Sequence, residues 1–199
     1  MTLRLASFGL RGFVGQSLSP REAMDFASAF GTFVDGGRIL LGRDTRYSSP
    51  MIHSAVTASL LSCGCEILDF GVCPTPVLQY SVKPNAAAGA LSISGGHNQM
   101  GWNALTLIGA DGAFLEPAVG EAVLDAYHAA DFLLRDATHM GTIVPRADYF
   151  PPYMKALAAL VDRAAIRAAG YTVLIDPVGG AGCPFLEEFS REFGLNLVA

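Results

Sequence analysis

The chain has 199 residues, enough for one complete domain and part of a second. Hydrophobic residues make up 51% and charged residues 16%, so we expect a well-packed core. The net charge of −5 gives no support for nucleic-acid binding, and no apolar run is long enough for a transmembrane helix. Since the N-terminus also lacks the pattern of a secretion signal, we expect a cytoplasmic protein that binds neither nucleic acid nor membrane.

The first part of the chain alternates helical and strand patterns. Ser19-Pro20-Arg21-Glu22 is typical of a helix start, with serine as N-cap and proline at the first helical position. Short apolar runs between turn residues predict buried strands. We expect strands at about 38–42, 65–70, 88–93 and 102–108, and helices at about 20–35, 49–62, 74–84 and 116–129.

Periodicity is weak at 130–150, where Pro145, Pro151 and Pro152 interrupt the chain. A helix is expected from about Tyr153, and after Gly170 a strand, a helix and a second strand follow. A single strand-helix-strand unit cannot bury both its faces, so we expect a truncated second domain. The expected fold is α/β: a layered α/β/α domain with a mixed sheet at 1–135, a linker at 136–152, and the start of a second similar domain at 153–199.

The cysteine spacing does not predict a metal site. A zinc site needs two spaced pairs of ligands, and no matching pair of His or Cys follows the first three cysteines. We therefore expect buried, reduced thiols at Cys63, Cys65, Cys73 and Cys183.

Two arginine-containing segments follow or flank predicted strands, where α/β proteins bind ligands. Gly9-Leu10-Arg11-Gly12 is read as a loop whose guanidinium suits a phosphate, although a solvated surface turn is the simpler interpretation. In the segment from Gly42 to Ser49, Asp44 stands close to two arginines. An ion-pair network that fixes this loop is the favoured interpretation of that segment.

A third loop, Ser94-Gly95-Gly96-His97-Asn98, follows the predicted strand at 88–93. Successive glycines allow backbone N–H groups to converge on an anion, and a histidine can donate a hydrogen bond or carry a proton. The loop is therefore a candidate phosphate site.

Taken in chain order, these motifs resemble those of the phosphohexomutases, the family of phosphoglucomutase, phosphomannomutase and phosphoglucosamine mutase. The resemblance covers almost the whole chain. It rests on Gly9-Leu10-Arg11-Gly12, Gly42 to Ser49, Gly71-Val72-Cys73-Pro74-Thr75-Pro76, Ser94 to Asn98, Trp102-Asn103, Asp111-Gly112 and the stretch from Asp176 to Gly182.

The resemblance implies an isomerase that moves a phosphoryl group between the C1 oxygen and a terminal hydroxyl of a hexose phosphate. It implies Mg²⁺ in the full-length protein, held by a loop that lies outside these residues. It places catalytic positions at Arg11, Gly96 and His97. The implied phosphate-binding residues are Arg11, Ser94, Gly95, Gly96, His97 and Asn98.

The sequence departs from the family pattern at five positions. Phe8 stands where the family usually has a serine, and Ala104 where it has the glycine of Asn-Gly. Gly96 stands where the family has the serine that carries the phosphate, Thr106 where it has a lysine, and Gln99 where it has a proline.

Three hypotheses remain open. The chain belongs to a divergent mutase with Ser94 or His97 as carrier, to a catalytically degenerate paralogue that binds phosphosugars, or to an inactive fragment that keeps the loops as scaffolding.

Overall fold

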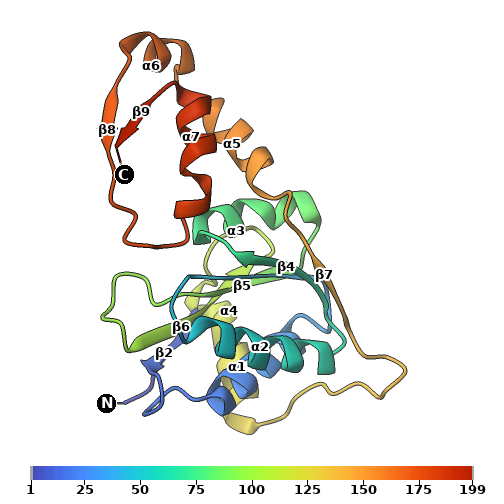
Figure 1. Ribbon diagram of the computed structural model, residues 1–199. Helices are drawn as coiled ribbons and strands as arrows, with labels where there is room; N and C mark the ends of the chain where they lie inside the picture. Colours follow the sequence, from blue (N-terminus) through green and yellow to red (C-terminus); the bar gives the residue numbers. More distant parts are fainter. Residues whose placement is uncertain (1, 199) are drawn as a thin grey trace. The chain divides into compact units, whose positions relative to one another are not determined.

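A computed structural model describes residues 2–198 and divides the chain into two compact units, Met1–Arg146 and Ala147–Ala199. The first unit is built on one seven-stranded sheet with the order β1-β2-β6-β5-β3-β4-β7 (Figure 1). In this spatial order, the strand pairs from β1 across to β5 are antiparallel and the pairs from β5 across to β7 are parallel. The sheet is therefore mixed, as expected. Its strands are β1 (Arg4–Ala6), β2 (Gly9–Phe13), β3 (Ile39–Arg43), β4 (Glu66–Val72), β5 (Gly89–Ile93), β6 (Trp102–Gly109) and β7 (Thr142–Pro145).

Helices cover both faces of this sheet, which confirms the layered α/β/α arrangement. In Figure 1, α1 (Pro20–Phe33), α2 (Ser49–Ser62) and α4 (Pro117–Ala129) lie below the sheet and α3 (Thr75–Ser81) lies above it. The connection through α2 leads from β3 outward to β4, and the connection through α3 leads back across β3 to β5. Since both connections join parallel strands and are right-handed, the two helices lie on opposite faces. A short 3₁₀ helix, η1 (Lys83–Asn85), follows α3.

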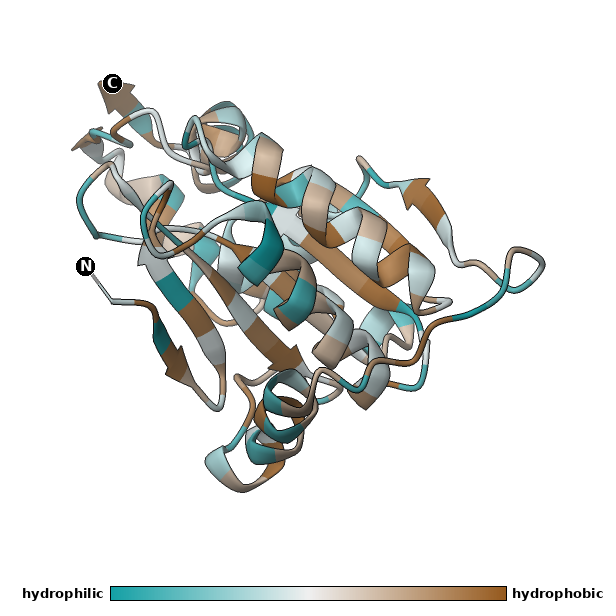
Figure 2. Cartoon of the chain, turned by 90° about the horizontal axis from the view of Figure 1, so that it is seen from below, coloured by the Kyte–Doolittle hydropathy of each residue, from teal (hydrophilic) through white to brown (hydrophobic). Residues whose placement is uncertain are grey.

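The core lies between the sheet and the α1 layer. Phe26 and Phe30 of α1 are fully buried in one cluster with apolar residues of β3, β5 and β6, including Leu41, Leu91 and Leu105. In Figure 2 the central strands are brown along much of their length, whereas the helices carry both brown and teal residues. Each fully buried side chain of this size stabilises the fold by about 1.5–3 kcal/mol.

Three strands of the first unit lie where none was expected, and the first of them is β1 (Arg4–Ala6). Gly9–Phe13 forms β2 rather than a loop, and the expected linker contains β7. The glycine at position 9 reflects close packing, because a Cβ there would lie 2.6 Å from the carbonyl oxygen of Leu105 on β6. β7 has only four residues, all of them exposed, so its short apolar pair Ile143-Val144 is too brief to stand out as a strand in the sequence.

The second unit contains the expected strand-helix-strand arrangement. Its strands are parallel and pair Thr172 with Asn196. The helix expected from Tyr153 is interrupted at Asp162, whose carboxylate accepts a hydrogen bond from the Ala165 N–H at 2.9 Å and caps a separate helix. The elements are α5 (Phe150–Ala158), α6 (Arg163–Ala169), β8 (Thr172–Leu174), η2 (Cys183–Phe185), α7 (Leu186–Phe193) and β9 (Asn196–Val198).

Candidate functional site

The site loop, residues 94–101, joins the end of β5 to the start of β6 and is built from tight turns. The Ser94 hydroxyl accepts a hydrogen bond from the Gly96 N–H at 3.2 Å. The carbonyl of Gly95 accepts two, from the backbone N–H of Asn98 at 3.1 Å and from its side-chain amide at 2.7 Å. These local bonds bring the expected phosphate-binding segment, Ser94 to Asn98, into one compact turn.

Arg46, from the loop after β3, fixes the backbone of the site loop. Its Nη1 atom donates to the carbonyls of Gln99 at 2.8 Å and Trp102 at 3.2 Å. Its Nη2 atom donates to the carbonyls of Gly96 at 3.0 Å and Asn98 at 2.6 Å. One guanidinium group thus binds four carbonyl oxygens at the turn between β5 and β6.

Asp44 holds Arg46 and the site loop together. Its Oδ2 atom lies 3.3 Å from Arg46 Nε and accepts a hydrogen bond from the Gly95 N–H at 2.9 Å. Its Oδ1 atom accepts bonds from the Arg46 N–H at 3.1 Å and from the Ser49 hydroxyl. The side chain of Asn103, which is fully buried, donates to the same hydroxyl at 2.9 Å.

Of the ion-pair network predicted for this loop, the Arg46–Asp44 pair forms, whereas Arg43 donates to the carbonyl of Asp44 at 3.1 Å. The Arg46–Asp44 pair also positions the neighbouring site loop.

The two adjacent glycines have different surroundings. Gly95 is buried, and a Cβ at this position would lie 2.2 Å from Arg46 Nε. Gly96 is exposed and has a φ of +54°, with open space where a Cβ would project. Glycine at 95 is therefore required by contact with Arg46, whereas glycine at 96 is favoured by backbone conformation alone.

The site loop leaves donor groups available for a ligand. His97 is exposed and its imidazole forms no hydrogen bond with any residue of 2–198. The backbone N–H groups of His97, Gln99, Met100 and Gly101 likewise donate no hydrogen bond within the described part of the chain. Unpaired amide N–H groups of one turn, together with an imidazole, are groups that can bind an anion.

Arg11 lies on β2 and not in the loop that the sequence analysis assigned to it. It is paired in register with Ala104 of β6, and its guanidinium carbon lies 6.0 Å from the ring centre of Trp102. Trp102 directly follows the site loop and also contacts Phe13, with ring centres 6.2 Å apart. Arg11 is thus next to the end of the site loop, although it forms no hydrogen bond with His97.

Thr106, which stands where the family has a lysine, lies on β6 opposite Gly9. It is two residues from Ala104, the partner of Arg11, so Thr106 and Arg11 project from the same face of the sheet.

Arg46 and Asn103 were not among the residues expected in the site. The density of charge around Asp44 was the available signal for Arg46, and the Trp-Asn motif was the signal for Asn103.

Among the described residues, the cysteines contribute no side chain to the hydrogen bonds of the site loop. All four are free thiols, buried at Cys63, Cys65 and Cys73 and half-buried at Cys183. Burial raises the pKa of Cys65 and Cys73 to about 12, so these thiols are poor nucleophiles at neutral pH. Within residues 2–198 no group of three or more His, Cys, Asp or Glu side chains is placed to hold a metal ion.

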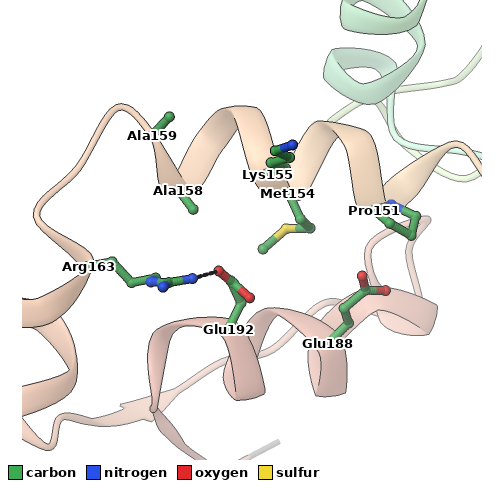
Figure 3. Close-up of a pocket in the computed structure, with 8 residues that line it drawn as sticks. All are labelled: Pro151, Met154, Lys155, Ala158, Ala159, Arg163, Glu188 and Glu192. Carbon is green, nitrogen blue, oxygen red and sulfur yellow. Dashed lines mark hydrogen bonds and ion pairs between the residues drawn. The ribbon is translucent and has the colours of Figure 1, made fainter.

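A hollow in the second unit lies between α5 and α7 (Figure 3). Arg163 and Glu192 form an ion pair in this hollow, and Met154 and Lys155 line it from α5. It contains none of the residues that the motifs single out. Separately, no helix between residues 2 and 198 has the length and apolar character needed to span a membrane.

The layered, mixed sheet with a glycine turn and an arginine network at its strand ends defines an α/β/α protein with a preformed loop site. Residues 5–134 match the family described as phosphoglucomutase/phosphomannomutase, alpha/beta/alpha domain I. The chain therefore belongs to the phosphohexomutase family.

Relatives with assigned names align along nearly the whole chain. A phosphoglucomutase/phosphomannomutase of Thermococcus kodakarensis is 31% identical over 97% of this chain and 43% of its own length. A phosphoglucosamine mutase of Prochlorococcus marinus is 34% identical over 96% of this chain and 42% of its own length. The chain thus spans about two fifths of the length of these relatives.

Solved structures share the fold. A phosphoglucomutase/phosphomannomutase family protein from Burkholderia thailandensis superposes with a TM-score of 0.76 at 21% identity. The match covers 96% of this chain and 42% of the other. At this level of identity the likeness supports the architecture only.

Proposed function

We propose that this chain supplies the phosphate-binding part of a phosphohexomutase, an isomerase that transfers a phosphoryl group within a hexose phosphate. The observation that carries the proposal is the site loop, whose backbone is fixed by Arg46 and Asp44 while His97 and four backbone N–H groups stay available. Family membership and the names of the relatives support this function over a catalytically degenerate paralogue or an inactive fragment.

The proposed roles follow from the chemistry of each group. His97 and Arg11 are the proposed catalytic groups, because an imidazole can carry a proton and a guanidinium binds two phosphate oxygens. Ser94, Gly95, Gly96 and Asn98 complete the proposed phosphate site through the backbone turn. Since Gly96 has no hydroxyl, Ser94 and His97 are the nucleophilic side chains that this segment retains.

For the full-length protein we propose Mg²⁺ dependence, a hexose phosphate as substrate, and a cytoplasmic location without nucleic-acid partners. The support is the family resemblance and, for the substrate, the names of the relatives. None of the roles given above for residues of this chain depends on a metal.

Nitrogen-15-labelled chain titrated with inorganic phosphate, and then with glucose 1-phosphate, tests the proposal by NMR. We expect the largest shifts at the amides of residues 95–101 and at the Arg11 side chain. Glucose without phosphate is the control and should leave these signals in place. Shifts spread evenly over the surface, or none at millimolar phosphate, contradict the proposal.

A further inference from the structure

A second arginine lies beside Arg11 on the edge of the sheet. The β1–β2 register places Arg4 directly opposite Arg11, and the β2–β6 register places Arg11 opposite Ala104. Residues that are directly opposite in antiparallel strands share a face, and residues two apart on a strand share it as well. Arg4, Arg11 and Trp102 are therefore on one face of the three strands.

Both guanidinium groups approach the same indole ring. The guanidinium carbon lies 5.7 Å from the ring centre of Trp102 for Arg4 and 6.0 Å for Arg11. The face of a tryptophan attracts a cation, and here it brings two cations to one aromatic group. Because Trp102 directly follows the site loop, both arginines lie beside its end.

Neither arginine has an acidic partner. Within residues 2–198 the side chains of Arg4 and Arg11 form no ion pair and no hydrogen bond. Other arginines of the same unit are paired, for example Arg38 with Glu66 at 2.9 Å and Arg46 with Asp44 at 3.3 Å. Like charges directly opposite each other in a sheet are destabilising, so an uncompensated pair is a ready site for an anion.

We propose that Arg4 and Arg11 together bind one phosphate group of a phosphorylated sugar, with Trp102 holding both guanidinium groups in place. The inference rests on the proposed function and deepens it, because it adds a phosphate ligand that the motifs do not contain. A dianionic phosphate monoester fits this pair, since each guanidinium can donate two parallel hydrogen bonds to phosphate oxygens. Arg4 is exposed and Arg11 half-buried, so the site is open to solvent on the Arg4 side.

The chain contains a single tryptophan, so fluorescence reports on this site directly. The intact 199-residue chain is titrated with inorganic phosphate and with glucose 1-phosphate, and the emission of Trp102 is followed. Arg4→Gln should raise the dissociation constant by about 10-fold or more, the loss expected for charge-assisted hydrogen bonds. Arg21→Gln is the matched control, because it removes the same charge from an exposed arginine of α1. It should change the dissociation constant less than about 2-fold, the effect of a distant screened charge.

The outcomes separate this inference from the proposed function. If the parent chain and Arg4→Gln bind phosphate equally while Arg11→Gln does not bind, the proposed function stands and the role of Arg4 is refuted. Equal losses in Arg4→Gln and Arg21→Gln refute it too, because only net charge then matters. If the parent chain binds no phosphate by fluorescence or by NMR, the proposed function fails and this inference fails with it.

Discussion

The Nη2 atom of Arg46 lies 2.6 Å from the carbonyl oxygen of Asn98, the shortest of the four bonds by which this guanidinium holds the backbone of the site loop. Arg46 follows β3 and Asn98 follows β5, so the bond joins two loops that are far apart in the sequence. Its charge is matched by Asp44, so Arg46 acts as a positioning residue for the loop, and Arg11 and His97 remain for the ligand.

Arg46→Ala should therefore disorder the site loop and weaken phosphate binding. Four carbonyls and the Asp44 carboxylate lose their shared donor, and a buried polar group left without a partner costs about 1–3 kcal/mol. We expect a stability loss of this size and a drop in phosphate affinity of about 10-fold or more, measured by urea unfolding and NMR titration. Arg38→Ala is the control, because Arg38 also binds a carboxylate and a carbonyl but lies just before β3, at the other end of that strand. Equal losses of affinity in the two variants would indicate a general effect of stability.

Gly95→Ala tests the contact between the two loops. The added methyl group would lie 2.2 Å from Arg46 Nε, so the guanidinium has to move and its bonds weaken. Overpacking of this kind costs about 1–3 kcal/mol, measured as the free energy of unfolding. In the double variant with Arg46→Ala the clash disappears, so the two losses should be less than additive. Strict additivity would contradict the contact.

Gly96→Ser restores the family hydroxyl and tests the conformation of the loop. With φ at +54° and open space around it, serine should fit but lose about 1–2 kcal/mol from the left-handed backbone. Gly71→Ser is a matched control, because Gly71 has a φ of +59° and equally open surroundings outside the loop. Thermal unfolding should give similar losses for both variants. A much larger loss at position 96 would mean that the hydroxyl disrupts the turn.

Asp69 makes stability depend on pH. Burial alone would raise the pKa of this carboxyl, but the hydrogen bonds from His53 at 2.9 Å and from the Gly71 N–H at 2.9 Å lower it below its usual value. Because the pKa of Asp69 is lower in the folded than in the unfolded chain, its ionised carboxylate stabilises the fold. This stabilisation is complete above the unfolded-state pKa of about 4 and is lost as the pH falls through the folded-state pKa. Asp69→Asn should thus cost about 1–3 kcal/mol at pH 7 and progressively less below pH 4, measured by urea unfolding. Glu121→Gln, an exposed carboxylate of α4, should show no such dependence.

The first domain was expected to end at residue 135, whereas the first compact unit extends to Arg146. A chain ending at residue 135 lacks β7, which pairs with β4 from Glu66–Thr142 to Asp69–Pro145. We expect a chain that ends at Arg146 to be more stable than one that ends at residue 135 by about 1–3 kcal/mol, the net value of a few backbone hydrogen bonds. Equal stability in urea would place the boundary at residue 135.

Local signals predicted most of the fold. The capping residues Ser19 and Glu22 fixed the start of α1, and buried apolar runs predicted β3, β4, β5 and β6. The edge strands β1 and β7 are only three and four residues long, too short to show such a pattern, and β7 pairs with β4 from a distant part of the sequence. Edge strands are therefore predicted less well than central ones.

The site was predictable where a motif brings its own chemistry, as in the Gly-Gly-His turn. The role of Arg46 could not be inferred, since it depends on carbonyl groups more than 50 residues away, such as that of Asn98. Arg4 belongs to no motif and becomes visible only through the register of β1 against β2. Neither the position of a backbone carbonyl acceptor nor the register of two strands can be recognised from the types of the residues involved.

The pairing of β2 with β6 has a consequence for how the chain folds. It joins Gly9 to Thr106, so nearly the whole first unit must be arranged before these strands meet. Contacts between such distant segments form late, because the entropy of closing a long loop has to be overcome first. We therefore expect the Arg11–Trp102 face to be completed late in folding, after α1 and α2 have packed together. Phosphate would then stabilise only the completed sheet, and ligand binding would mark the last step of refolding.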